Sequence, residues 1–337
     1  MKTILLGLAI AASALPAWCQ SAPQLVQPAR EETYCYFSGD SRRLATGAGT
    51  IRVWDLPTLR LLKTYKPSHD VLSVALSQDG RRLALGSYPR HLQVWDIDRN
   101  KLIFELPIVP GATDNVGAYK VQFSPDGKQL LAVGACRGRS DYDQVVHVYD
   151  LTRGKEVRRW AWDIRTKRGS CVWGEHNQVV RLYDEADTLE FFSVDTGKSL
   201  RKVKLSNRAQ ALNRHQEHLE LLLETGDATQ EATYSLAGEP LASRTSRTEY
   251  DKKLPGVKES VQSIEGDLLF LSQIGYGGPA NFYTLQGKKL GHLPFVGAPE
   301  LSPDGHILAM AVDKGIWLMD VTKSLASGKL SPWKPTR

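Results

Sequence analysis

Short apolar segments, separated by clusters of turn residues, run along most of the 337-residue chain. The pattern is clearest over residues 37–55, where an apolar start leads through a Ser-Gly-Asp-Ser turn to a second apolar run, and then to a segment that ends in Trp54-Asp55. Short runs that alternate apolar and polar positions are typical of β-strands. Helical periodicity is nearly absent, so the pattern predicts an all-β protein.

The same unit returns along the chain. Three further clear copies, each opening with a Ser-x-Asp-Gly turn, lie at 76–96, 123–150 and 301–320. Three degenerate copies fill the middle of the chain, at 171–195, 211–236 and 261–285. A repeat of roughly forty to fifty residues indicates one supersecondary unit per copy.

Each unit predicts four antiparallel strands. In Ser-Pro-Asp-Gly, Pro presets φ for the turn and Gly takes the left-handed position that closes a tight hairpin. One four-stranded sheet cannot bury both of its faces, whereas sheets stacked in a ring cover one another. The sequence therefore predicts a single seven-bladed β-propeller of four-stranded antiparallel blades over residues 22–337.

A propeller ring needs a strand that closes it. Residues 24–27 are apolar and directly precede the first inner strand, so we expect them to form the outer strand of the last blade. The C-terminal tail, 324–333, is the rival candidate.

The N-terminal residues resemble a secretory signal peptide. A positive start at Lys2 is followed by an apolar run over 4–14 and by a break over 15–20. The run is too short to span a membrane, which needs about 20 apolar residues. We predict a signal peptide over 1–21, a periplasmic or secreted protein, and no transmembrane segment after cleavage. A retained anchor, a buried helix or a lipid on Cys19 are alternatives, although bulky Trp18 fits a lipid site poorly.

Charge and cysteine content exclude some classes of protein. The formal net charge of +6 is spread along the chain without a Lys/Arg block, so nucleic acid is not an expected partner. Cys35, Cys136 and Cys171 remain after cleavage, and three cysteines cannot all pair within one chain. We expect buried thiols rather than a Cys136–Cys171 disulfide, because valine fills the Cys171 position in other units.

Trp54-Asp55 and Trp95-Asp96, each closing a strand after a Ser-x-Asp turn, resemble the WD-repeat propeller family. The similarity covers nearly the whole mature chain. The Gly-His pair usual before such a unit is absent, and residues 47–50 lack the Asp of the family's Asp-His-Ser-Trp network. The chain therefore resembles a divergent, exported bacterial member, and the resemblance implies a non-catalytic binding protein.

The candidate reactive groups do not converge. His215 and His218 flank a predicted tight turn, where two imidazoles point apart, so no metal site is expected. His147 alternates with Val146 and Val148 and indicates a polar strand face.

Stretch 150–160 is similar to the tryptophan-docking hairpin of quinoprotein propellers, so a quinone-dependent dehydrogenase or hydrolytic propeller is the alternative. We predict no catalytic residue, no metal and no cofactor. The recurring Asp55, Asp96, Asp150, Asp195 and Asp320 indicate turn or strand-end roles.

The remaining candidates are loop residues on one predicted face of the ring. Tyr, Trp and Arg are enriched at binding hot spots, and clustered Arg and Lys favour an anionic partner. The sequence therefore predicts a scaffold that binds a protein, an acidic one included, or an anionic polymer of the bacterial envelope. The candidate partner-binding residues are Tyr88, Arg90, Arg137, Arg139, Tyr142, Trp162, Arg165, Lys167 and Arg168.

Overall fold

A computed structural model shows a protein built almost entirely of antiparallel strands. Its described part contains strands β1 to β27 and one short helix, α3 (Val321–Ser327). The described residues are 24–26, 34–47, 49–67, 70–88, 91–107, 118–137, 142–163, 169–183, 186–215, 217–225, 228–245, 261–264, 268–272, 280–284, 288–293, 299–312 and 315–335.

Three four-stranded antiparallel sheets occupy the first half of the chain, each with its strands in sequence order. The first contains β2 (Tyr34–Phe37), β3 (Arg43–Gly47), β4 (Ile51–Asp55) and β5 (Arg60–Tyr65). The second contains β6 (Asp70–Leu76), β7 (Arg82–Tyr88), β8 (His91–Asp96) and β9 (Lys101–Pro107). The third contains β10 (Ala118–Phe123), β11 (Gln129–Arg137), β12 (Tyr142–Asp150) and β13 (Lys155–Asp163).

The middle of the chain forms one seven-stranded sheet instead of separate four-stranded ones. Residues 199–204 of its long strand β17 pair with β16, residues 211–215 pair with β18, and Ala209 has partners on both sides. β17 therefore ends one group of four strands and begins the next. The strands are β14 (Gly169–Trp173), β15 (Gln178–Tyr183), β16 (Ala186–Ser193), β17 (Ser199–His215), β18 (His218–Thr225), β19 (Ala228–Ser235) and β20 (Pro240–Thr245).

Two more four-stranded sheets complete the described structure. One contains β21 (Val261–Ile264), β22 (Leu268–Ser272), β23 (Ala280–Thr284) and β24 (Lys289–Leu293). The other combines β25 (Glu300–Leu301), β26 (Ile307–Val312) and β27 (Gly315–Asp320) with the N-terminal β1 (Gln24–Val26).

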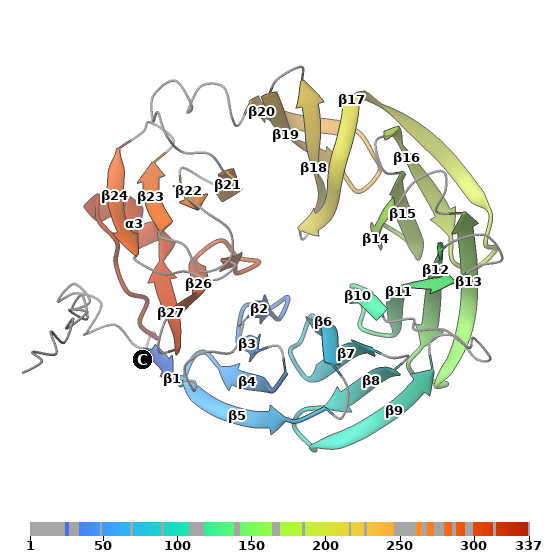
Figure 1. Ribbon diagram of the computed structural model, residues 1–337, viewed down its shortest axis with the longest axis horizontal. Helices are drawn as coiled ribbons and strands as arrows, with labels where there is room; N and C mark the ends of the chain where they lie inside the picture. The colour runs from blue at the N-terminus through green and yellow to red at the C-terminus, as the bar shows by residue number, and fades with distance from the viewer. Residues whose placement is uncertain are drawn as a thin grey trace, which may run out of the picture.

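The sheets follow one another around a common centre, as Figure 1 shows. The first strands β2, β6 and β10 lie innermost, while β5, β9 and β13 run along the outside. The all-β class and the repeated antiparallel sheets of a propeller-type fold are thereby confirmed. The count of seven blades stays a prediction.

Both ends of the described chain lie against β27. Strand β1 pairs with residues 315–317, which confirms the expected N-terminal closing strand. The C-terminal tail borders the other half of β27, since Trp333 N donates to Leu318 O at 2.9 Å and Asp320 N donates to Ser331 O at 2.9 Å. The rival candidate thus contributes as well, although its residues 324–327 belong to α3. This helix starts at the Asp320 cap, whose carboxylate accepts from Lys323 N at 2.7 Å.

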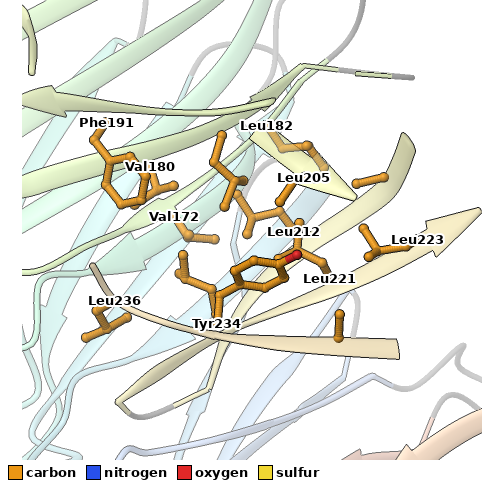
Figure 2. Packing of buried hydrophobic residues seen from close by; sticks show 14 residues of the cluster. Val172, Val180, Leu182, Phe191, Leu205, Leu212, Leu221, Leu223, Tyr234 and Leu236 are labelled. Carbon is orange, nitrogen blue, oxygen red and sulfur yellow. The ribbon is translucent and has the colours of Figure 1, made fainter. Parts of the chain in front are cut away.

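Hydrophobic clusters lie between neighbouring sheets. Figure 2 shows the cluster between the two groups that share β17, with Val172 and Phe191 facing Leu221 and Tyr234. A second cluster joins the first sheet to the last, because Leu44 packs with Ile316 and others. Full burial of such a side chain stabilises the fold by about 1.5–3 kcal/mol. The same burial therefore drives folding and closes the ring.

The Ser-x-Asp turns have a shared hydrogen-bond pattern. Ser38 Oγ donates to Asp40 Oδ1 at 2.6 Å and accepts from Arg43 N at 2.9 Å. Ser38 is fully buried, and its hydroxyl pairs with backbone groups that the hairpin would otherwise leave without a partner. The equivalent bonds occur at Ser77, Ser124 and Ser302.

Candidate functional site

The inner strands enclose a cavity of about 920 Å³ near the centre of the ring. Its wall continues to the Ser-x-Asp turns, since Gly39, Gln78, Pro125 and Pro303 also line it. Strands from sheets far apart in the sequence therefore build one site. The charged lining residues are Lys120, Arg214, Glu217 and Glu300.

Lys120 on β10 and Glu300 on β25 are half-buried on the wall of this cavity. Burial lowers the pKa of Lys120, because the charged ammonium loses its hydration. Burial, followed by repulsion from Glu220, raises the pKa of Glu300 to about 7. Neither group has a hydrogen bond or ion pair within the part of the chain that the structure describes.

Tyr36 places a phenol beside the Glu300 carboxyl on the cavity wall. Burial raises the pKa of Tyr36, and the charge of Glu300 raises it further. The phenol therefore stays protonated at neutral pH and is available there as a hydrogen-bond donor.

Arg214 links two strand groups rather than pointing freely into the cavity. Its Nη1 donates to Trp173 O at 3.1 Å and to Gly174 O at 2.8 Å. Burial lowers the pKa of Arg214, while the nearby carboxylates of Glu217 and Glu175 oppose that shift. The guanidinium thus holds β14 and β17 together at the edge of the site.

Two other arginines connect consecutive Ser-x-Asp turns. Arg43 Nη1 donates to Gly80 O at 2.9 Å, and Arg82 Nη1 donates to Gly127 O at 2.8 Å. Sequence reasoning missed these links. The sequence feature that could have indicated them is an arginine two positions after the end of the turn, which occurs in both of the first two units.

The recurring aspartates occupy turns, as predicted. Asp96 Oδ1 accepts from Arg99 N at 2.9 Å, and Asp150 Oδ1 accepts from Thr152 N at 2.8 Å. The hydrogen bond from Arg99 N lowers the pKa of Asp96. These carboxylates stabilise their own loops and do not line the cavity.

His147 lies on the strand face that the alternation predicts, stacked on Tyr149, but it is fully buried. Its Nδ1 lies 2.7 Å from Glu156 Oε2. Burial lowers the pKa of His147, and the Glu156 carboxylate opposes that shift. The residue therefore belongs to the packed interior of the third sheet.

His215 and His218 lie at the facing ends of β17 and β18, so the predicted turn is present. His218 Nε2 is 3.5 Å from Glu220 Oε1. Within the described ranges, no group of three His, Cys, Asp or Glu side chains is placed to hold a metal ion.

Cys171 and Cys35 are both free thiols. Cys171 is fully buried and Cys35 almost fully. Burial raises the pKa of Cys171 to about 11, while Arg181 and Lys120 act in the opposite direction. Cys136 lies in β11 opposite Asp143.

Four of the nine predicted loop residues are described, and they lie at the sheet edges opposite the Ser-x-Asp turns. Tyr88 ends β7, and Arg137 ends β11 directly across from Tyr142 at the start of β12. Trp162 lies near the end of β13, across from Gln144. The remaining five, Arg90, Arg139, Arg165, Lys167 and Arg168, lie outside the described residues.

A ring of antiparallel sheets joined by repeated Ser-x-Asp turns defines the class of propeller-type repeat proteins. The family model described as "WD domain, G-beta repeat" matches residues 59–96. In the preceding unit, outside the matched residues, the buried Trp54 Nε1 donates to Thr46 Oγ1 at 2.9 Å. Over residues 59–96 the chain is similar to WD-repeat proteins.

Two curated proteins show the extent of this similarity. The serine-threonine kinase receptor-associated protein of Gallus gallus is 25% identical over 180 residues, which cover 53% of this chain and 47% of that protein. The WD repeat-containing protein VIP3 of Arabidopsis thaliana is 33% identical over 101 residues, covering 26% of this chain and 30% of that protein. The chain thus spans less than half the length of each relative.

Among the residues whose structure is described, no helix has the length and apolar character needed to cross a membrane.

Proposed function

We propose that this protein is a non-catalytic scaffold that binds a protein partner. The observation that carries the proposal is that the recurring polar residues serve the structure of their own turns. The repeated Ser and Asp side chains bond to backbone groups of their own turns, so the repeats build surface rather than a reactive centre. WD-repeat relatives support this role, and one of them is named as receptor-associated.

The proposed place of action is the bacterial envelope. Residues 1–21 begin with a positive charge, continue with an apolar run and end in small residues. This order supports export to the periplasm or the cell exterior. Amino-terminal sequencing of the protein recovered from the periplasmic fraction tests this part. A mature terminus between residues 20 and 22 supports it, and an intact Met1 in a cytoplasmic fraction contradicts it.

The proposed contact surface is the loop face formed by the nine candidate residues from Tyr88 to Arg168. Its arginines and lysine favour an acidic protein or an anionic envelope polymer, and its Tyr and Trp residues suit hot-spot contacts. Its four described residues, Tyr88, Arg137, Tyr142 and Trp162, lie at the sheet edges opposite the Ser-x-Asp turns, so the exposed cations near those turns can serve as a control.

Cross-linking and affinity capture from an envelope fraction test the surface. The test variant is Arg137/Arg139/Arg165/Arg168→Ala. A matched control, Arg42/Arg81/Lys128/Lys198→Ala, removes four exposed cations from the opposite edges. Loss of a defined partner in the test variant alone supports the proposal. Equal capture by both variants removes the loop face from it.

A further inference from the structure

Two oppositely charged side chains face the central cavity without a partner among the described residues. The Lys120 ammonium and the Glu300 carboxyl both line it, and within the described ranges neither takes part in a hydrogen bond or ion pair. Both side chains are half-buried, so each charge has lost part of its hydration and gains from a polar partner. A ligand in the cavity with one positive and one negative group would supply both partners.

The two charges stand on opposite walls. Strand β10, which carries Lys120, lies across the ring from the β26–β27 sheet, to which β25 and Glu300 belong (Figure 1). Arg214 and Glu217 also line the cavity, but the Arg214 guanidinium already donates to Trp173 O and Gly174 O. Lys120 and Glu300 are therefore the charged lining groups considered for a ligand.

We propose that the central cavity binds a free short peptide of three or four residues through its two charged termini. The peptide carboxylate pairs with Lys120, and its terminal ammonium pairs with Glu300. This ligand site is separate from the loop face and does not depend on the scaffold role.

The size of the cavity agrees with this ligand. A volume of about 920 Å³ lies in the range of small-molecule sites, which are roughly 300–1,000 Å³. A sphere of that volume is about 12 Å across, the length of three or four extended residues. A single amino acid, whose two charges are adjacent, is too short to reach both walls.

The remaining lining residues suit a peptide backbone. Gln78, Gln122 and Asn213 offer both amide donors and carbonyl acceptors. Leu72 is 46% exposed and also lines the cavity, so it presents an apolar surface to peptide side chains.

Calorimetric titration of the purified full chain with alanine peptides tests the proposal, because these peptides carry charge only at their termini. We expect tri- or tetra-alanine to bind at least tenfold more tightly than alanine itself. N-acetylation or C-amidation of the peptide each lowers the affinity at least tenfold. No saturable binding of any free alanine peptide at millimolar concentration overturns the proposal.

Combining protein and peptide changes assigns each terminus to its wall. Lys120→Met and Glu300→Gln each lower the affinity for tri-alanine at least tenfold. Lys120→Met has no further effect on the amidated peptide, and Glu300→Gln has none on the acetylated one. Matched controls, Lys128→Met and Glu239→Gln, change exposed charges that do not line the cavity and leave binding unchanged.

A segment within a longer partner chain is the competing occupant. Blocked peptides with an internal Glu and Lys that bind as tightly as free tri-alanine contradict the assignment to termini. Thermal unfolding of each variant checks folding. If a variant does not fold, the comparison of blocked and free peptides on the unchanged protein still decides the question.

Discussion

The backbone N–H of Asp304 donates a hydrogen bond of 3.1 Å to Ser41 Oγ, although the two residues are 263 positions apart. Ser41 lies in the turn of the first unit, and Asp304 lies in the turn of the last. The bond therefore joins the two sheets that meet where the ring closes, above the hydrophobic cluster that contains Leu44 and Ile316.

Ser41 makes this hydrogen bond from a strained backbone conformation. Its φ of 57° is left-handed, where the turns of three other units have Gly80, Gly127 and Gly305. Ser41→Ala keeps that strain and leaves Asp304 N–H without its acceptor, so we expect a loss of about 1–2 kcal/mol in unfolding free energy. Ser41→Gly loses the same bond but relieves the strain, so its loss is smaller.

Urea unfolding of both Ser41 variants measures the difference. Ser243→Ala, an exposed change on β20, is the control and is expected within about 0.5 kcal/mol of the unchanged protein. A glycine variant less stable than the alanine variant would show that strain at residue 41 is unimportant.

Removing residues 329–337 is expected to destabilise the last sheet. The deletion eliminates the two backbone hydrogen bonds between the tail and β27, together with the buried Leu330 side chain. Summed over these groups, the unfolding free energy should fall by about 3–5 kcal/mol. Thermal unfolding measures it, with deletion of residues 335–337 as the control.

Deleting the chain up to Val26 should add to that effect, because β1 pairs with residues 315–317 and the tail with the other half of β27. Distant, independent changes are additive within about 0.5 kcal/mol. If either deletion alone is as damaging as both, the two termini act on one shared contact instead.

Arg43→Lys is expected to destabilise the fold even though it keeps the charge. The guanidinium reaches both Gly80 O at 2.9 Å and Asp98 Oδ1 at 2.7 Å, which a lysine ammonium cannot do in the same geometry. We expect a loss of about 1–2 kcal/mol in urea unfolding. Arg42→Lys, at the exposed neighbouring position, is the control. Equal stability of both variants would contradict the linking role of Arg43.

Glu300 should make stability depend on pH. Its pKa of about 7 in the folded chain lies above the ordinary value of 4.5. Between these values the folded protein holds a proton that the unfolded chain has released, so stability falls as pH rises from about 4.5 and levels off above about 7. The decrease is at most about 3 kcal/mol.

Glu300→Gln removes the titrating group, so its unfolding free energy should decline less between pH 5 and pH 8. Glu239→Gln, an exposed change, should keep the full decline. Denaturant unfolding at several pH values compares them. A decline unchanged by Glu300→Gln would assign the pH dependence to other groups.

Within one unit, local patterns were sufficient for prediction. Ser38, Asp40 and Arg43 complete their turn with hydrogen bonds across at most five positions, so the motif and its geometry appear together in the sequence. The same reasoning predicted the strand-end roles of Asp96 and Asp150 and the turn between His215 and His218.

Features that join units were not predictable in this way. Nothing near Arg43 in the chain indicates Gly80 O as its acceptor, 37 positions away. His147 was expected on a polar strand face, yet it is buried, because burial depends on the neighbouring sheet and not on strand alternation. The shared strand β17 likewise depends on how two units meet.

The sequence by itself determined the all-β repeats and their turns, because these depend on hydrogen bonds and alternation among nearby residues. It also predicted the N-terminal closing strand, from its apolar residues and its place just before the first inner strand, although that strand pairs with residues 315–317. Only the tertiary structure decided that the C-terminal tail also borders β27, and that Lys120 and Glu300 face one cavity. The physical reason is that ring closure brings together strands from opposite ends of the chain, and their burial and charge environment exist only once the sheets have packed.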